Sequence, residues 1–129
     1  MTEQLSPLAL QALAVVKESG AIIGANHAHP HTIRHKGRID LVTETDIAVE
    51  AFLKERLATL APQAGFLAEE SAEDLSLPDT CWIIDPVDGT TNFAHGLPLT
   101  VTSVAYRLNG EIVLGIVNAP LLRECFIAE

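Results

Sequence analysis

The stretch from Trp82 to Phe93 constrains the fold of this chain more strongly than any other part of its sequence. It begins with the apolar run Trp-Ile-Ile, which predicts a buried β-strand. The run stops at Asp85 and Asp88, and the Gly-Thr-Thr-Asn that follows predicts a tight turn leading into a helix. Both carboxylates are therefore expected at the carboxyl end of a strand, beside the free backbone N–H groups of a helix N-terminus.

This arrangement predicts a metal site next to an anion site. Hard cations such as Mg²⁺ prefer oxygen ligands, and helix N-termini attract phosphate. Hydrolysis of a phosphate ester uses both a metal site and an anion site. The alternative is a plain turn, because Asp-Pro and Asp-Gly pairs are common turn residues that carry no chemistry.

A second acidic segment, Asp40–Glu50, contributes Asp46. Thr43 is expected to cap a helix, with Asp46 at the third helical position in a variant of the capping box. An apolar face then recurs at helical spacing until Pro62 closes the segment. Helix capping alone is a sufficient structural reason for Asp46, so its chemical role stays open at this point.

A third segment, Gly65–Ser71, is a short apolar strand followed by the adjacent acids Glu69 and Glu70. Acids at a strand end are often merely solvated. Several catalytic sites nevertheless gather residues from the carboxyl ends of strands. If Glu69 converges with Asp85 and Asp88, repulsion among the carboxylates would cost several kcal/mol, and a divalent cation would remove that cost.

These segments together resemble the inositol monophosphatase family. Leu41–Asp46, Ala68–Ser71 and Trp82–Phe93 match the family's first three signatures in order and approximate spacing, and the likeness covers essentially the whole chain. The resemblance implies an α/β fold, in which residues 1–129 form the N-terminal, metal-binding part of a layered α/β/α/β/α sandwich with a largely antiparallel sheet and the C-terminal half is absent. It also implies a Mg²⁺-dependent, lithium-sensitive phosphomonoesterase that hydrolyses inositol monophosphate or a similar sugar phosphate.

The resemblance further implies a metal-binding role for a group of oxygen atoms. Glu69, Asp85 and the carbonyl of Val87 would hold one Mg²⁺, and Asp85 with Asp88 would contribute to a second. A metal lowers the pKa of bound water, which makes a nucleophile available at neutral pH without a covalent intermediate. No cluster of basic residues stands in for the metals, since Lys and Arg total only eight.

The catalytic roles that the resemblance implies fall on Asp46, Glu69 and Thr90. The hydroxyl of Thr90, paired with Asp46, would orient the attacking water and help to deprotonate it, and Glu69 would reach a third metal through water. The backbone N–H groups of Gly89 and Thr90 would hold the phosphate, and Asp88 would also face the sugar hydroxyls.

The chain departs from the family pattern in three places. Ala68 stands where the family usually has Gly, and a positive φ there would cost about 1–2 kcal/mol for alanine. The segment around Lys36 matches the family's active-site loop only loosely. Family members run to roughly twice this length, which leaves a second hypothesis: a non-catalytic metal-binding module, or a subunit that needs a partner to complete the site.

Charge and cysteine usage narrow the expected partners. The formal net charge of −9 argues against binding to nucleic-acid phosphates, so we expect a small-molecule sugar or inositol phosphate instead. No signal peptide or membrane-spanning stretch is evident in the sequence, which predicts no membrane partner. Cys81 and Cys125 are expected as buried, reduced thiols in a cytoplasmic protein. Uncovered sheet surface would favour a homo-oligomer.

The remaining elements follow from local signals. Ser6-Pro7 predicts a helix start and Gly24 its end. Asn109-Gly110 predicts a hairpin between strands 101–107 and 111–117, with a third strand at 123–128. Gly115 suggests a bulge or close packing. The alternating histidines 27, 29 and 31 could bind Zn²⁺ or Ni²⁺, but a polar connection is favoured because no fourth ligand is nearby.

Overall fold

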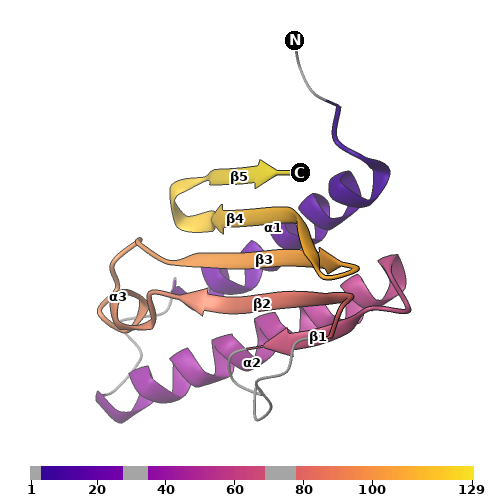
Figure 1. Cartoon of the computed structure of the whole chain (residues 1–129). Helices are drawn as coiled ribbons and strands as arrows, with labels where there is room; N and C mark the ends of the chain where they lie inside the picture. The colour runs from indigo at the N-terminus through magenta and orange to yellow at the C-terminus, as the bar shows by residue number, and fades with distance from the viewer. Residues whose placement is uncertain (1–3, 28–34, 69–77) are drawn as a thin grey trace.

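The computed structural model describes residues 4–27, 35–68 and 78–129 and shows a mixed α/β fold built on one sheet (Figure 1). The sheet has the order β1-β2-β3-β4-β5. Its first two strands run parallel and the other neighbouring pairs antiparallel, so the predicted largely antiparallel sheet is confirmed. The strands are β1 (Gly65–Ala68), β2 (Cys81–Asp88), β3 (Val101–Leu108), β4 (Glu111–Ala119) and β5 (Glu124–Ala128).

Two long helices, α1 (Pro7–His27) and α2 (His35–Leu60), cover one face of this sheet, behind it in Figure 1. The described side chains between helices and sheet form a hydrophobic core, in which Trp82 of β2 and Val16 of α1 are fully buried. The opposite face is not covered by any element of the described part of the chain. Phe126 and Val117 on that face are 61% and 38% exposed.

Helix α1 begins where the sequence predicts. The Ser6 hydroxyl oxygen accepts a hydrogen bond from the backbone N–H of Ala9 at 3.1 Å, as an N-cap does, and Pro7 is the first helical residue. The predicted stop at Gly24 is wrong, because the helix continues to His27. Glycine lowers helix stability by only about 1 kcal/mol, which the core packing of Ile23 outweighs.

By length and composition α1 is also long and apolar enough to cross a membrane. The expectation that no stretch approaches that length is therefore corrected. Its buried residues belong to the hydrophobic core, as those of an interior helix do.

Helix α2 begins nine residues earlier than the capping signal predicts. It starts at His35, so Thr43 lies inside the helix and is not its N-cap, and Lys36 belongs to the helix. Threonine is compatible with a helix interior because its hydroxyl can bond back to the preceding turn. The apolar face is confirmed, with Leu53 and Leu57 fully buried, and the helix ends at Leu60 before Pro62.

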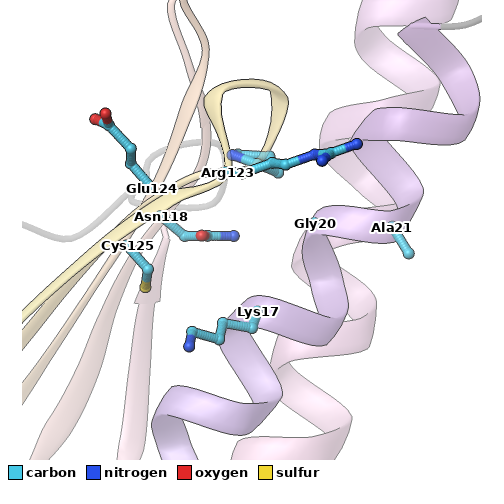
Figure 2. A pocket seen from close by; sticks show the side chains of 8 residues that line it. Lys17, Gly20, Ala21, Asn118, Arg123, Glu124 and Cys125 are labelled. Atoms are coloured by element: carbon cyan, nitrogen blue, oxygen red, sulfur yellow. The ribbon is translucent and has the colours of Figure 1, made fainter.

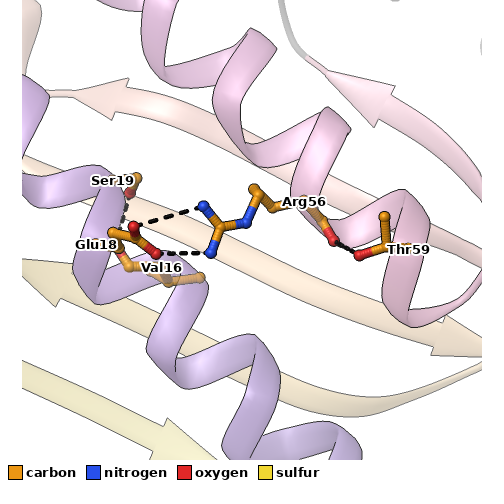
Figure 3. A network of polar contacts seen from close by, with 5 residues as sticks. All are labelled: Val16, Glu18, Ser19, Arg56 and Thr59. Atoms are coloured by element: carbon orange, nitrogen blue, oxygen red, sulfur yellow. Dashed lines mark hydrogen bonds and ion pairs between the residues drawn. The ribbon is translucent and has the colours of Figure 1, made fainter.

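The two long helices are joined on their outer surface by one ion pair (Figure 3). The Arg56 guanidinium donates to both carboxylate oxygens of Glu18, at 2.9 and 3.5 Å, and lies 5.1 Å from the ring centroid of Phe52. Both charged side chains are about half exposed, so the pair orients the helices more than it stabilises them.

The C-terminal meander also follows the prediction. Asn109 and Gly110 both have positive φ, 51° and 85°, as a type I′ hairpin turn requires. The third strand of the meander is β5. Neither the bulge nor the close packing expected at Gly115 is present: this residue pairs regularly with Ala105, and no atom of another segment lies within 4 Å of where its Cβ would be.

Candidate metal and phosphate site at the end of strand β2

A β-bulge separates the two aspartates at the end of β2. Asp85 pairs with Ser103 and Asp88 pairs with Val101, so three steps along β2 match two steps along β3. Side chains alternate between the faces of a regular strand, and an i, i+3 pair would point to opposite faces. The extra residue cancels that alternation, because Ser103 and Val101 lie on the same face of β3. Both aspartates consequently belong to one face of the sheet.

That face is the one that the long helices leave uncovered. Ile84, next to Asp85, is buried in the core under the helices, so Asp85 belongs to the other side of the strand. Asp85 is half-buried and Asp88 is exposed. The two carboxylates thus have access to solvent and to ions.

Buried residues on both strands hold the bulge in place. Pro86 has no backbone N–H to leave unpaired in the disrupted ladder. Its carbonyl oxygen accepts a hydrogen bond from the hydroxyl of Thr102 at 2.8 Å, and Thr102 is fully buried. The side chain of Val87 is 3% exposed and belongs to the hydrophobic core. The bulge is therefore fixed from both strands.

The turn after Asp88 depends on Gly89. This residue has φ 88° and precedes the short helix α3 (Thr90–Ala94), which confirms the predicted turn into a helix. A Cβ on Gly89 would lie 2.6 Å from the carbonyl oxygen of Leu99, so glycine is required for both conformation and space. The same oxygen accepts a hydrogen bond from the Asn92 amide at 2.9 Å, which ties the two ends of the loop together.

Phe93 and His27 hold helix α3 in place. Phe93 is 4% exposed in the core, and its ring centroid lies 6.0 Å from that of His27. The His27 Nε2 atom lies 3.1 Å from the carbonyl oxygen of Gly96. His27 therefore ends α1 and supports the α3 turn, while His29 and His31 lie outside the described residues. No pattern in the sequence indicated the supporting roles of His27, Asn92 and Thr102.

Asp46 lies on α2, the helix that packs against α3. It is 8% exposed and lines a pocket of about 280 Å³. The preceding residue, Thr45, is fully buried and accepts a hydrogen bond from the Asn26 amide at 2.7 Å, which fixes this turn of α2 against α1. Thr90 begins α3 and is exposed. The pairing of Thr90 with Asp46 stays a prediction.

Glu69 lies outside the described residues, so its place beside the aspartates stays a prediction. Ala68, which precedes it, is the last described residue of β1 and pairs with Ile84, the neighbour of Asp85. Ala68 does not have a positive φ, so the strain expected from alanine at this position is absent. Among the described residues, no group of three or more His, Cys, Asp or Glu side chains could hold a metal ion.

Both cysteines are free thiols. Burial raises the pKa of Cys81 and of Cys125, although the nearby Arg107 and Lys17, respectively, oppose that effect. Cys81 is buried as expected, whereas Cys125 is half-buried and lines a pocket on the helix side of the sheet.

Comparison with known proteins places these features in one family. The model of the inositol monophosphatase family matches residues 4–129. An inositol monophosphatase of Dictyostelium discoideum is 45% identical over 121 residues, which are 91% of this chain and 44% of the relative. The Nus factor SuhB of Salmonella typhimurium is 34% identical over 127 residues, 96% of this chain and 48% of the relative.

The fold agrees with that of solved structures. The crystal structure of inositol monophosphatase-II from Staphylococcus aureus superposes with a TM-score of 0.82 at 27% sequence identity, covering 95% of this chain and 46% of that one. The chain thus spans about half the length of the relatives it matches.

Proposed function

Because this chain belongs to the inositol monophosphatase family, we propose that it carries the metal-binding part of a Mg²⁺-dependent phosphomonoesterase for inositol monophosphate or a similar sugar phosphate. The observation that carries the proposal is the β2 bulge, which sets Asp85 and Asp88 on one accessible face. The Gly89 turn and the start of α3 follow directly. Ligands for a cation and donors for an anion are thereby adjacent, as phosphate ester hydrolysis uses them.

The donor set fits a hard cation, because every candidate ligand is an oxygen atom. Asp85, Asp88, Glu69 and the Val87 carbonyl would hold Mg²⁺, which when bound polarises the phosphate and lowers the pKa of water. The fixed bulge keeps two of these ligands in place without the metal, since Val87 and Thr102 are buried.

The chain's own residues would bind the phosphate and move the proton. The backbone N–H groups of Gly89 and Thr90 lie at the start of α3 and would donate to phosphate oxygens. The Thr90 hydroxyl would orient the attacking water, and Asp46, a nearly buried carboxylate, would accept the proton through it. Asp88, which is exposed, would face the sugar hydroxyls.

The test is phosphate release from inositol 1-phosphate by the purified chain, with Mg²⁺ and with a chelator. We expect turnover that the chelator abolishes, that lithium inhibits and that Asp88→Asn removes. Asp79→Asn is the matched control, because Asp79 is an exposed aspartate that precedes β2 and lies outside the site. Turnover that survives in Asp88→Asn would refute the assignment.

A second candidate function has its own support. The sheet face that carries Asp85 also exposes the apolar side chain of Phe126. That exposed apolar surface favours a metal-binding module whose site is completed by another chain or copy. It would bind Mg²⁺ without turnover and self-associate, which sedimentation analysis of the same sample would reveal. A monomer with full activity would exclude it.

A further inference from the structure

A loop of exposed apolar residues follows helix α3. Leu97, Pro98 and Leu99 are all exposed, the two leucines by 47% and 56%. Figure 1 shows that this segment connects α3 to β3 at the end of the sheet opposite to the β3–β4 hairpin. Residues 96–99 are called the apolar loop below. A single exposed leucine is ordinary, but two on one short loop form a patch of the kind that binds a partner.

Hydrogen bonds hold the apolar loop in one conformation. The Leu97 backbone N–H donates to the Asn92 carbonyl oxygen at 2.8 Å, and the Asn92 amide donates to the Leu99 carbonyl oxygen at 2.9 Å. Gly96 has φ 75°, and its N–H donates to the carbonyl oxygen of the core residue Phe93 at 3.1 Å. The loop is therefore fixed before a partner binds, so that binding orders few further groups and loses little entropy.

The apolar loop lies within the longest stretch of the chain that has no charged residue. No Asp, Glu, Lys or Arg occurs between Asp88 and Arg107, although the whole chain has a formal net charge of −9. Two copies of such a chain repel each other wherever their acidic surfaces approach, so they meet most favourably at an uncharged surface. A basic partner would instead be attracted to the acidic surface. The charge pattern therefore favours a second copy of this chain as the partner.

The uncovered sheet face is less suited to pairing with a second copy. Phe126 is exposed there, but it has carboxylates on the same face. Glu124 lies two residues before Phe126 in β5, and Figure 2, a view of the pocket that Cys125 lines, shows the Glu124 carboxylate pointing away from α1. Asp85 belongs to this face too. Without a metal ion, these carboxylates would repel those of a second copy.

We propose that the chain forms a symmetric dimer through the apolar loop, in which Leu97 and Leu99 of one copy pack against the same residues of the other. A two-fold axis through the contact lets one surface serve both copies and closes the assembly at two. The Leu99 carbonyl oxygen lies against Gly89, so the interface adjoins the turn after Asp88. The inference does not depend on the proposed function, because association is measured without a phosphate ester or a metal.

Sedimentation equilibrium of the whole chain in a chelator, over a wide range of chain concentrations, tests the proposal. We expect a reversible equilibrium of monomer and dimer without larger species. Leu97→Ser and Leu99→Ser should each weaken the dimer by about tenfold or more, because each substitution removes a leucine from both copies. Ile112→Ser is the matched control, since Ile112 is exposed to a similar degree beside the β3–β4 turn, and it should leave the dimer unchanged.

Phe126→Ser distinguishes the apolar loop from the sheet face, and we expect it to dimerise as the unmodified chain does. A dimer that is lost in Phe126→Ser but kept in Leu99→Ser overturns the proposal. So does a chain that stays monomeric at every concentration, grows into larger assemblies or dimerises equally in all variants. Circular dichroism of the same samples confirms folding, and Leu99→Met, which keeps an apolar side chain, should restore the dimer.

Two measurements on the unmodified chain complete the test. Salt should strengthen the dimer, because it screens the repulsion between two acidic copies; a dimer that salt weakens would mean that charged groups form the contact. In NMR spectra, the methyl signals of Leu97 and Leu99 should change with chain concentration while those of Ile112 stay in place. Leucine signals that do not change as the dimer forms would contradict the interface.

Discussion

Substitution of Gly89 by alanine tests the structural basis of the candidate site. The φ of 88° is unfavourable for any residue with a Cβ, at about 1–2 kcal/mol. The new Cβ would also lie 2.6 Å from the Leu99 carbonyl oxygen, so the backbone has to move. That movement breaks the hydrogen bond from Asn92 to Leu99, which contributes about 0.5–1.5 kcal/mol. Together we expect a loss of about 1.5–3.5 kcal/mol in the free energy of unfolding.

Two other glycines provide matched controls. Gly96 has φ 75° but nothing within 4 Å of its Cβ position, so Gly96→Ala should cost only the conformational part, about 1–2 kcal/mol. Gly24 lies inside α1, also with nothing within 4 Å, and Gly24→Ala should raise stability by about 0.5–1 kcal/mol. Urea denaturation followed by circular dichroism measures all three variants against the unmodified chain.

The ranking of the three variants by their free energy of unfolding tests this reasoning. We expect Gly89→Ala to be the most destabilising of the three variants and also to lose phosphate release, because the turn carries the backbone donors. If Gly89→Ala costs no more than Gly96→Ala, the contact with Leu99 does not constrain the turn and the reasoning is refuted.

Three further predictions concern the support of the fold. Thr102→Val should cost about 1–3 kcal/mol in urea denaturation, because it leaves the buried Pro86 carbonyl unpaired; an unchanged midpoint would contradict this. Leu53→Ala should cost about 2–5 kcal/mol, since Leu53 is fully buried, and a smaller loss would mean that the core collapses around the gap. Hydrogen bonds from Ser6 lower the pKa of Glu129 below its usual 4.5, so their stabilising effect is present at neutral pH and is lost as the pH falls through that lowered value. An NMR titration of the Glu129 carboxyl group should show the lowered pKa, and Ser6→Ala, which removes the side-chain donor but keeps the backbone donor, should raise that pKa part of the way toward its usual value.

The sequence predicted those elements that depend on local signals. The apolar run before Asp85, the Gly89 turn and the Asn109-Gly110 hairpin all involve residues that are neighbours in the chain, so their patterns were sufficient. The start of α2 was predicted wrongly because Thr43 has the residue type of a cap, yet the preceding residues continue the helix.

Features that depend on pairing between distant segments were not predictable. The bulge in β2 is defined by the register of Asp85 and Asp88 against β3, and no local pattern specifies that register. The pocket between α1 and the 3₁₀ turn η3 (Pro120–Leu122), which Lys17 and Arg123 line, forms because these two elements pack together. They are more than 90 residues apart in the sequence. The sequence pattern was sufficient to predict that Asp85 and Asp88 lie at the end of a strand. That both lie on one face of the sheet follows only from the register of β2 against β3.

We infer that the bulge aligns Asp85 and Asp88 to bind Mg²⁺, and calorimetric titration of the chain with Mg²⁺ is the critical experiment. We expect Asp85→Asn and Asp88→Asn each to weaken Mg²⁺ binding by about tenfold or more, while Asp79→Asn leaves it unchanged. Circular dichroism of the same samples confirms folding. Equal Mg²⁺ affinity in folded samples of all variants would contradict the account.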